Sequence, residues 1–277
     1  MISREDLNKK LEEEIKKEKA IKISKKILKI FLVIMLIFSI LFLYMYFIGI
    51  KFMKTNEYSI KDNNIPESFK GSKILHFTDL LYGKTIDLDE LSNEIKLINP
   101  DIVIFTGNLI DNNYEINEDE IKNLNLFMKN IPYTIGKYAI YGNLDSQTYN
   151  LIMENTDFNI LDNEIIKVYN NNDYINIIGI NSKNEKIINQ NDYSYTITLI
   201  NNYDNYENYN ITSNLVFAGS NLGGEIKIFT IPLVRNNKYL NNFYEFNNTK
   251  VYISNGLGSP HHMRFMNHPS INVYRLW

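Results

Sequence analysis

The stretch KILHFTDLLYG (73–83), with DIVIFTGNLID (101–111) and KYAIYGNLD (137–145) after it, decides the fold. Each stretch has a short apolar core, which predicts a buried strand, and ends in a polar or glycine-containing turn. The intervening sequence predicts helices at about 88–98 and 118–130, the second with a capping box formed by Asn117 and Glu120. Strand, helix, strand, helix, strand is the order of an α/β unit.

Further strands are predicted downstream, so the remainder of the chain favours a second sheet packed on the first. The runs are YINIIGIN (174–181), YTITLINN (195–202), NLVFAGS (214–220), KVYISNGLG (250–258) and INVYRLW (271–277). We therefore expect an α/β domain of two packed β-sheets flanked by helices over 70–277, with a linker and a first strand at 51–69. The tract NNYDNYENYN (201–210) is expected to be an exposed, poorly ordered loop.

One apolar run, Ile30–Ile50, holds 21 residues without a charge, enough to cross a hydrocarbon core of about 30 Å as a helix. A cleaved signal peptide is the competing interpretation. The run exceeds the usual apolar region of about 7–15 residues, and no small-residue cleavage site follows it. The sequence therefore predicts one transmembrane helix at 30–50.

Charges around this helix predict its orientation. Seven lysines precede it closely, against Lys51, Lys54 and Lys61 after it, so the positive-inside rule places residues 1–29 in the cytoplasm and the domain outside. The tail itself reads as a charged helix with Leu7, Leu11 and Ile15 four residues apart. This spacing permits a coiled-coil partner, but a solvated helix near anionic headgroups is favoured because the stripe does not last three heptads.

Composition excludes several classes of function. The chain of 277 residues has 29 Lys and Arg against 32 Asp and Glu, so its net charge of -3 argues against a nucleic-acid partner. It has no cysteine, which excludes disulfides, thiolate metal sites and a cysteine nucleophile. Only four histidines are available for chemistry.

Five polar turns follow predicted strands, and the carboxyl ends of such strands are where α/β folds place their sites. They are FTDLLYG (77–83), FTGNLID (105–111), YGNLD (141–145), INN (200–202) and AGSNLGGE (218–225). In order and spacing these turns resemble the motifs of the calcineurin-like metallophosphoesterases, in particular their membrane-anchored bacterial branch. The family pattern is D-x-H, G-D-x-x-D, G-N-H-D, a lone His and G-H-x-H-G-G. The resemblance runs from about residue 56 to the C-terminus and implies the family's two-sheet fold.

The same resemblance implies a site with two divalent metals about 3.5–4 Å apart, which hold a phosphate ester and generate a hydroxide nucleophile. Of the positions that match its ligands, only Asp79 keeps an ionic side chain. Five other ligand positions are substituted: Leu81 stands for His, Asn108 for the bridging Asp, Asn201 for the lone His, and Ser220 and Leu222 for the last two histidines. The ligand Asn143 is retained. Leu144 stands where the family has the acid that protonates the leaving group.

Two metals carry about four positive charges, which one carboxylate with neutral amides and a hydroxyl cannot offset. We therefore expect no catalytic residue, no dinuclear metal site and no required cofactor. A residual cleft of Asp79, Asn108, Asn143 and Asn201 presents oxygens, so weak binding of one Mg²⁺, Ca²⁺ or Mn²⁺ is the alternative. The favoured interpretation is a polar cluster whose members satisfy one another's hydrogen bonds. Leu81, Leu144 and Leu222 make the former cleft apolar, and it is either closed by packing or a pocket for an apolar ligand.

The remaining titratable candidates receive simpler interpretations. His76 lies within a strand and is expected to be a core residue. His261, His262 and His268 are expected to be exposed loop residues, because adjacent residues of an extended chain point to opposite faces. Asp111 and Asp145 match family positions near the site, as surface carboxylates or caps.

The sequence thus predicts a membrane-anchored, degenerate metallophosphoesterase-like protein, a pseudoenzyme that acts as a binding or regulatory module at the cell envelope. Its partners are the membrane and an envelope protein or ligand that the sequence does not name. The alternative is a weakly active metal-dependent phosphoesterase with a rearranged or single-metal site.

Overall fold

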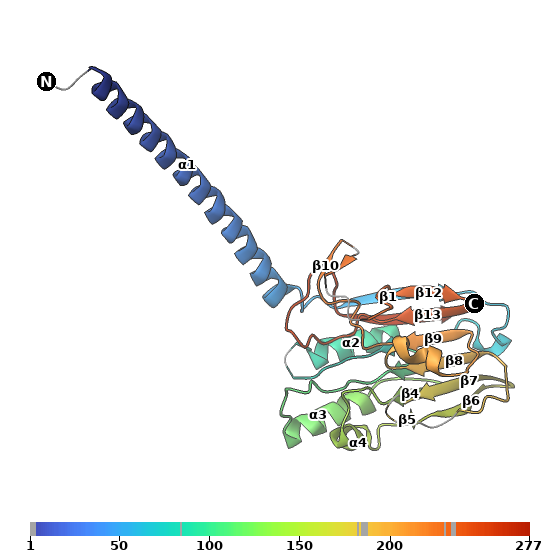
Figure 1. Cartoon of the computed structure of the whole chain (residues 1–277). Coiled ribbons are helices and arrows are strands. Elements are labelled where there is room, and N and C mark those ends of the chain that lie inside the picture. The colour runs from blue at the N-terminus through green and yellow to red at the C-terminus, as the bar shows by residue number, and fades with distance from the viewer. Residues whose placement is uncertain (1–3, 84, 182, 184–187, 230, 234–236) are drawn as a thin grey trace. The chain divides into compact units, whose positions relative to one another are not determined.

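The computed structural model describes residues 4–83, 85–181, 183, 188–229, 231–233 and 237–277. The chain forms two compact units, Met1–Met45 and Tyr46–Trp277. Figure 1 shows the first unit as a single long helix and the second as layered sheets and helices. The predicted α/β class with two sheets flanked by helices is confirmed.

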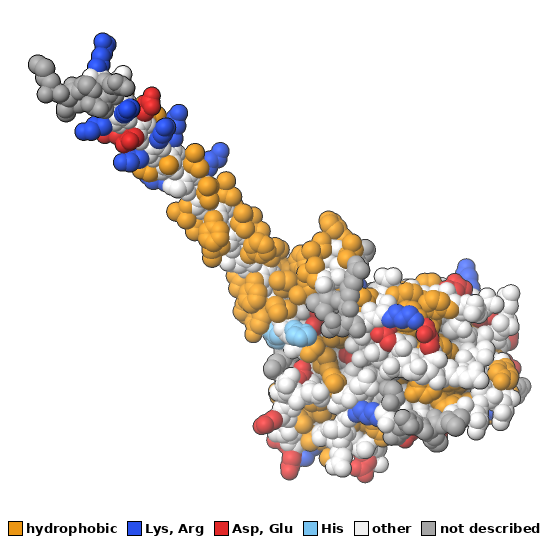
Figure 2. Space-filling view, viewed as in Figure 1, with side chains coloured by type: hydrophobic (Ala, Val, Ile, Leu, Met, Phe, Trp, Pro, Cys, Tyr) orange, Lys and Arg blue, Asp and Glu red, His pale blue; other side chains and the backbone are white. Residues whose placement is uncertain are grey.

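The N-terminal unit is one helix, α1 (Arg4–Leu43), so the expected tail and the expected transmembrane segment share a single helix rather than forming two elements. A π-helical turn, η1 (Tyr44–Ile48), follows it. Figure 2 shows hydrophobic side chains along much of this helix and charged side chains near its N-terminal end. Within the helical segment Asn8–Ile48, a stretch of 18 residues has a mean hydropathy of 2.8, so this helix is long enough and, over that stretch, apolar enough to span a membrane.

The first sheet has the order β1-β14-β2-β3-β4-β5. The strands β2, β3, β4 and β5 run parallel, β1 pairs in parallel with β14, and β14 is antiparallel to β2. Their bounds are β1 Lys54–Ile60, β2 Lys73–Phe77, β3 Ile102–Phe105, β4 Gly136–Ile140, β5 Phe158–Leu161 and β14 Ser270–Leu276. A short 3-10 turn, η2 (Glu67–Phe69), lies between β1 and β2.

Three helices lie between the parallel strands along the chain: α2 (Leu88–Ile98), α3 (Glu118–Lys129) and α4 (Gln147–Met153). Both helices predicted from the sequence are present, and Asn117 and Glu120 form the expected capping box. Apolar residues of these helices, such as Leu91, Leu124 and Ile152, pack on one face of the first sheet together with Phe77 and Phe105. This face is therefore closed to solvent by helices.

The second sheet has the order β12-β13-β9-β8-β7-β6. Its strands are β6 Glu164–Asn170, β7 Asp173–Ile180, β8 Thr196–Ile200, β9 Leu215–Ala218, β12 Phe243–Phe246 and β13 Thr249–Ile253. A separate two-stranded hairpin consists of β10 (Lys227–Ile228) and β11 (Ile231–Pro232).

The main core lies between the two sheets. Because side chains alternate along a strand, Ile74 and Ile104 of the first sheet point toward Ile177, Leu199 and the rest of the second sheet, while their neighbours point toward the helices. The two sheets share this apolar layer, so they are fixed with respect to each other, and turns at their edges can meet.

The expectation of a poorly ordered loop at 201–210 is wrong. Residues Tyr203–Asn208 form a 3-10 helix, η3, and Asn202 caps its first turn. Tyr203 is buried against the outer face of the second sheet, where Tyr206 and Tyr209 also pack. The repeated tyrosines, not the intervening asparagines, decide the structure of this tract, because each buries a large apolar ring.

Two turns at the edge of the first sheet approach each other closely. Gly107, after β3, has a φ of +87°, and a Cβ built there would lie 2.2 Å from the backbone nitrogen of Gly142, after β4. A side chain at either position would collide with backbone that cannot rotate away. The two glycines therefore set the spacing of the turns that carry Asn108 and Asn143.

We expect Gly107→Ala to destabilise the protein clearly more than Gly71→Ala. Both glycines have φ +87°, but a Cβ at Gly71 meets nothing within 4 Å. Gly71→Ala should therefore cost about 1–2 kcal/mol of unfolding free energy for backbone strain alone, and Gly107→Ala about 1–3 kcal/mol more for overpacking. Urea unfolding of the three proteins measures the difference. Equal losses would show that the two turns are not in firm contact.

Candidate functional site

The retained acidic residue of the first motif, Asp79, follows β2 and is buried. Its Oδ1 accepts a hydrogen bond of 2.7 Å from the side-chain amide of Asn108, and its Oδ2 accepts one of 2.8 Å from the backbone N–H of Ser220. Asn108 follows β3 of the first sheet and Ser220 follows β9 of the second. The carboxylate therefore joins the two sheets, and both of its oxygens face N–H donors.

Asn108 stands at the position that matches the family's bridging Asp. While its amide nitrogen donates to Asp79, its Oδ1 accepts a hydrogen bond of 2.9 Å from the backbone N–H of Leu144. The partners fix this orientation, because the Leu144 N–H requires an acceptor and the Asp79 oxygen requires a donor. Both ends of the amide are thus engaged within the protein.

Asn201, at the lone-His position after β8, is engaged in the same way. Its Oδ1 accepts a hydrogen bond of 3.2 Å from the backbone N–H of Asn143, and its amide nitrogen donates to the carbonyl of Thr106 at 2.7 Å. Asn201 is buried, whereas Asn143 is exposed. The structure therefore brings all four residues of the expected residual cleft into two hydrogen-bonded pairs.

Asp145 has a larger role than the sequence indicated. Its Oδ2 accepts hydrogen bonds from the backbone N–H groups of Asn108 at 2.8 Å and Gly142 at 2.7 Å, and its Oδ1 accepts one from Leu109 at 2.8 Å. This one carboxylate ties the turn after β3 to the turn after β4. Asp111, in contrast, caps its own turn by accepting from the N–H of Asn113. The sequence alone could not show which of the two aspartates binds both turns, because this depends on the close approach of Gly107 and Gly142.

The backbone has an unusual conformation at five of the positions that match the family's ligands. Asp79, Leu81, Asn108, Ser220 and Leu222 all have positive φ, between +44° and +65°. This left-handed region costs a residue with a Cβ about 1–2 kcal/mol. For the two leucines no local side-chain hydrogen bond offsets this cost, so the surrounding packing must hold these turns in place.

Packing around the leucines differs from one to the next. Leu81 is buried and Leu222 is half-buried, and both lie against the glycine turn 256–258. A Cβ at Gly256 would come within 2.7 Å of Leu222 Cδ2, and a Cβ at Gly258 would come within 2.4 Å of Leu81 Cβ. Leu144 is 37% exposed. The expected apolar cleft is thus filled by packing at Leu81 and Leu222 and meets solvent at Leu144.

Arg264 is a buried component of the site that sequence reasoning missed. Its guanidinium donates to the carbonyls of Gly258 at 2.6 Å and Asn255 at 2.9 Å, so it holds the closing glycine turn beside Asp79. Its positive charge also favours the ionised form of Asp79. The sequence signal was the Arg-Phe pair near the C-terminus, but nothing in one sequence shows that this arginine is internal.

Burial raises the pKa of Asp79 to about 6, although the hydrogen bonds from Asn108, Ser220 and Thr78 and the charge of Arg264 oppose this rise. Burial has the opposite effect on a base, and it lowers the pKa of His76 to about 3. His76 lies in the core as expected, where its Nε2 is 3.0 Å from the hydroxyl of Thr106. It is therefore a neutral structural residue.

The C-terminal histidines do not form a group, and the expectation that all three are exposed is only partly right. His261 is exposed and bonds to Glu225, but His262 and His268 are half-buried. His262 lies in a turn with φ +52°, not in an extended chain, and its ring centroid is 4.5 Å from that of Tyr46. Within the described ranges, no cluster of three or more His, Asp or Glu side chains could hold a metal ion.

The donor set does not fit the two metals that the family's fold implies. Two divalent cations need several anionic or imidazole ligands, but Asp79 supplies the one carboxylate among the positions that match the family's ligands. Each oxygen of Asp79 already accepts a hydrogen bond, and an N–H group of Asn108 points at one of them. Leu81 and Leu222 offer no lone pair at all. No step that uses a metal can be derived from these residues.

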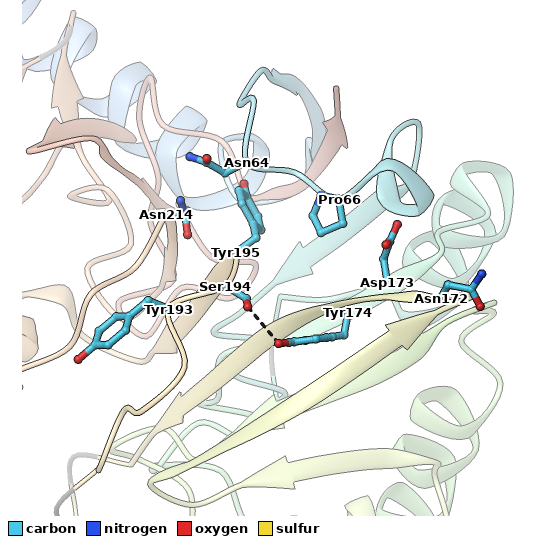
Figure 3. A pocket seen from close by; sticks show the side chains of 9 residues that line it. All are labelled: Asn64, Pro66, Asn172, Asp173, Tyr174, Tyr193, Ser194, Tyr195 and Asn214. Atoms are coloured by element: carbon cyan, nitrogen blue, oxygen red, sulfur yellow. Dashed lines mark hydrogen bonds between the residues drawn. The ribbon is translucent and has the colours of Figure 1, made fainter.

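A cavity of about 500 Å³ lies away from these turns, and Figure 3 shows its side chains. Residues of several loops and strands line it, among them Asn64, Asp173, Tyr174, Tyr195 and Asn214. Its walls are hydrogen-bonded internally, for example from Ser194 Oγ to the Tyr174 hydroxyl at 3.1 Å. None of the site positions discussed above lines it.

The fold and the five turns together define a metallophosphoesterase-type protein. The sequence pattern of the family described as calcineurin-like phosphoesterase matches residues 72–273, and the chain belongs to this family. The expected family and fold are therefore confirmed.

Two curated relatives are similar to the chain. It is 27% identical over 261 residues to the Bacillus subtilis (strain 168) protein named "Uncharacterized metallophosphoesterase YkuE", an alignment that covers 84% of this chain and 88% of that protein. It is 26% identical over 225 residues to the Campylobacter jejuni (strain NCTC 11168) protein named "Uncharacterized metallophosphoesterase Cj0846", covering 74% of this chain and 59% of that protein. A solved structure, TT1561 of Thermus thermophilus, aligns with a TM-score of 0.41 and 9% identity over 68% of this chain and 91% of that one.

We expect Asp79→Asn to gain stability relative to the wild type as the pH rises from about 4 to 7. Since the native pKa of Asp79 is about 6 and that of an unfolded Asp about 3.9, the native state holds the extra proton between these values. The contribution of Asp79 to the unfolding free energy of the wild type is fully present below about pH 4, and it is lost as the pH rises through 6. The variant does not ionise, so its difference from wild type should rise by about 1–3 kcal/mol, as measured by urea unfolding.

Asp173→Asn is the control, because a hydrogen bond from the N–H of Ser68 lowers the pKa of Asp173 below its ordinary value. Its native pKa thus lies below the value of about 3.9 for an unfolded Asp, so its difference from wild type should change little between pH 4 and 7. A pH-independent difference for Asp79→Asn would contradict the raised pKa.

Proposed function

We propose that the protein is a membrane-anchored, non-hydrolytic member of the calcineurin-like phosphoesterase family whose folded domain acts as a binding or regulatory module at the cell envelope. The observation that carries this proposal is the network in which Asp79, Asn108 and the backbone N–H groups of Leu144 and Ser220 hydrogen-bond to one another. The groups that would hold two metals and a phosphate instead hold the turns to each other.

The chemistry of the substituted residues supports the same conclusion. A leucine supplies neither a lone pair nor a proton, so Leu144 removes general-acid assistance, which is worth about 10²–10⁴-fold in rate. Leu81 and Leu222 remove imidazoles, and Asn108 removes the bridging charge. The losses affect metal binding and proton transfer separately, so one residue cannot compensate for all of them.

We further propose that the domain needs no metal cofactor. Its cores between the sheets and beneath the helices are extensive, so folding does not depend on an ion. The rival function, a weakly active phosphoesterase with one rearranged metal, would require Asp79 to exchange its hydrogen bonds for a cation. Among the described residues, Asp79 belongs to no group of three or more His, Asp or Glu side chains that could share such a cation.

Anchoring by α1 completes the proposal. Seven lysines of α1 precede its apolar part: Lys16, Lys17, Lys19, Lys22, Lys25, Lys26 and Lys29. By the positive-inside rule this end is cytoplasmic and the domain extracytoplasmic. The partner is an envelope protein or ligand, and the net charge of -3 argues against nucleic acid.

We expect no hydrolysis of bis-p-nitrophenyl phosphate above the buffer rate, with or without Mn²⁺. Asn108→Asp should be equally inactive, because a bridging carboxylate has nothing to bridge while the imidazole positions hold Leu81, Asn201, Ser220 and Leu222. Circular dichroism melts verify that the variant is folded. Metal-dependent turnover by the wild type that Asp79→Ala abolishes would overturn the proposal and establish the single-metal rival.

We expect the absence of cysteine to allow a clean test of topology. In intact cells stripped of their wall, a membrane-impermeant maleimide should label Tyr193→Cys, an exposed position of the domain, and should not label Ser24→Cys in α1. Detergent permeabilisation should expose both thiols. Labelling of Ser24→Cys alone in intact cells would reverse the orientation.

A further inference from the structure

The β10–β11 hairpin carries a concentration of exposed apolar side chains. Ile228, Phe229, Ile231 and Leu233 are 49%, 78%, 56% and 59% exposed. Figure 2 shows hydrophobic side chains gathered on this projecting segment. Single exposed apolar residues are ordinary, but four neighbours on one protrusion mark a surface that another apolar phase covers.

The base of the hairpin belongs to the same part of the domain as residues 46–54. Ile226 forms a bridge with Phe265, and the N–H of Lys227 donates to the carbonyl of Phe265 at 2.9 Å. The segment that contains Phe265 also carries His262, whose ring meets that of Tyr46. Further along, the carbonyl of Pro269 accepts from the N–H of Lys54 at 2.8 Å. One segment, 262–269, thus links the hairpin to the start of the folded unit.

The first residues of the folded unit, 46–50, are uncharged and largely apolar. The uncharged run ends at Ile50, which is buried in the domain, and β1 begins only four residues later, at Lys54. A spacer of three residues spans about 10 Å at most. A domain on so short a tether stays at the surface of any bilayer that the run crosses.

The surroundings have the composition of a membrane interface. Phe47, Phe52 and Met266 are exposed, and the exposed Lys51 and Lys54 lie beside them. Aromatic side chains favour the headgroup level, and lysines next to an apolar surface place their charges among anionic headgroups.

From these observations we propose that the β10–β11 hairpin inserts its apolar tip into the headgroup region of the bilayer that α1 spans. The domain is then held against the membrane at two points, the end of α1 and the hairpin. The occupant is a lipid surface because segment 262–269 joins the base of the hairpin to the residues that follow α1, and the neighbouring cations match anionic lipids. This inference rests on the proposed anchoring by α1.

The test uses the full chain in liposomes that contain phosphatidylglycerol, with an environment-sensitive fluorophore on single cysteines. Phe229→Cys reports the hairpin, Ile37→Cys reports the apolar part of α1, and Tyr169→Cys, at an exposed residue of β6, reports solvent. We expect lipids with a nitroxide near the headgroup to quench the probe at 229 more than lipids with a nitroxide deep in the chain. The probe at 37 should show the reverse order, and the probe at 169 no quenching.

The outcomes separate the inference from the anchoring on which it rests. Quenching at 37 without quenching at 229 overturns the hairpin proposal and leaves the anchor intact, whereas no quenching at either position overturns both. A blue-shifted probe at 229 that lipid nitroxides do not quench would overturn the hairpin proposal by showing that protein, such as a second copy of the chain, covers the hairpin.

A second variant keeps the test independent of the label at 229. With the probe moved to Leu233→Cys, the pair Ile228→Asp and Ile231→Asp should abolish quenching by lipid, because charges resist entry into the interface. The two changes lie outside the site turns and outside both six-stranded sheets, so an unchanged melting temperature verifies that the domain is folded. Undiminished quenching would contradict a role for the hairpin tip.

Discussion

A buried carboxylate is costly unless each of its oxygens is hydrogen-bonded, and Asp79 meets this condition only because two sheets present donors to it at once. Asn108 comes from the turn after β3, and Ser220 from the turn after β9. Other contacts hold the remaining turns at this edge. Asp145 binds the turns after β3 and β4 to each other, and Arg264 supports the glycine turn that passes beside Asp79.

Several turns at the positions that match the family's ligands have a backbone conformation that their side chains do not favour. Leu81 and Leu222 retain left-handed backbone that leucine disfavours. Gly256 and Gly258 admit these leucines at distances that no Cβ would permit. The simplest physical account is that the backbone path is fixed by contacts of glycine with backbone, so a change of side chain at a ligand position alters the chemistry without releasing the turn.

Much of this fold could be predicted from the sequence, because strand and helix periodicity and the Asn117 capping box are local signals. The expectation of no dinuclear metal site rests on residue type at positions such as Asp79 and Asn108, and it stays a prediction. The tract at 201–210 was mispredicted since composition hides the tyrosines that bury η3. The roles of Asp145 and Arg264 depend on which turns touch, and the short strands β10 to β12 carry little periodic pattern. Such features are decided by tertiary contacts that one sequence does not display.

The unbroken path of α1 gives the tail a mechanical property. Since the helix does not end between Lys29 and Ile30, residues 4–29 form a rod of about 39 Å that must move with the apolar part. In a bilayer whose thickness tilts that part by about 20°, the far end of the rod swings sideways by about 13 Å. If α1 spans a bilayer, any tilt of its apolar part would displace its charged end by a distance that the length of this rod sets.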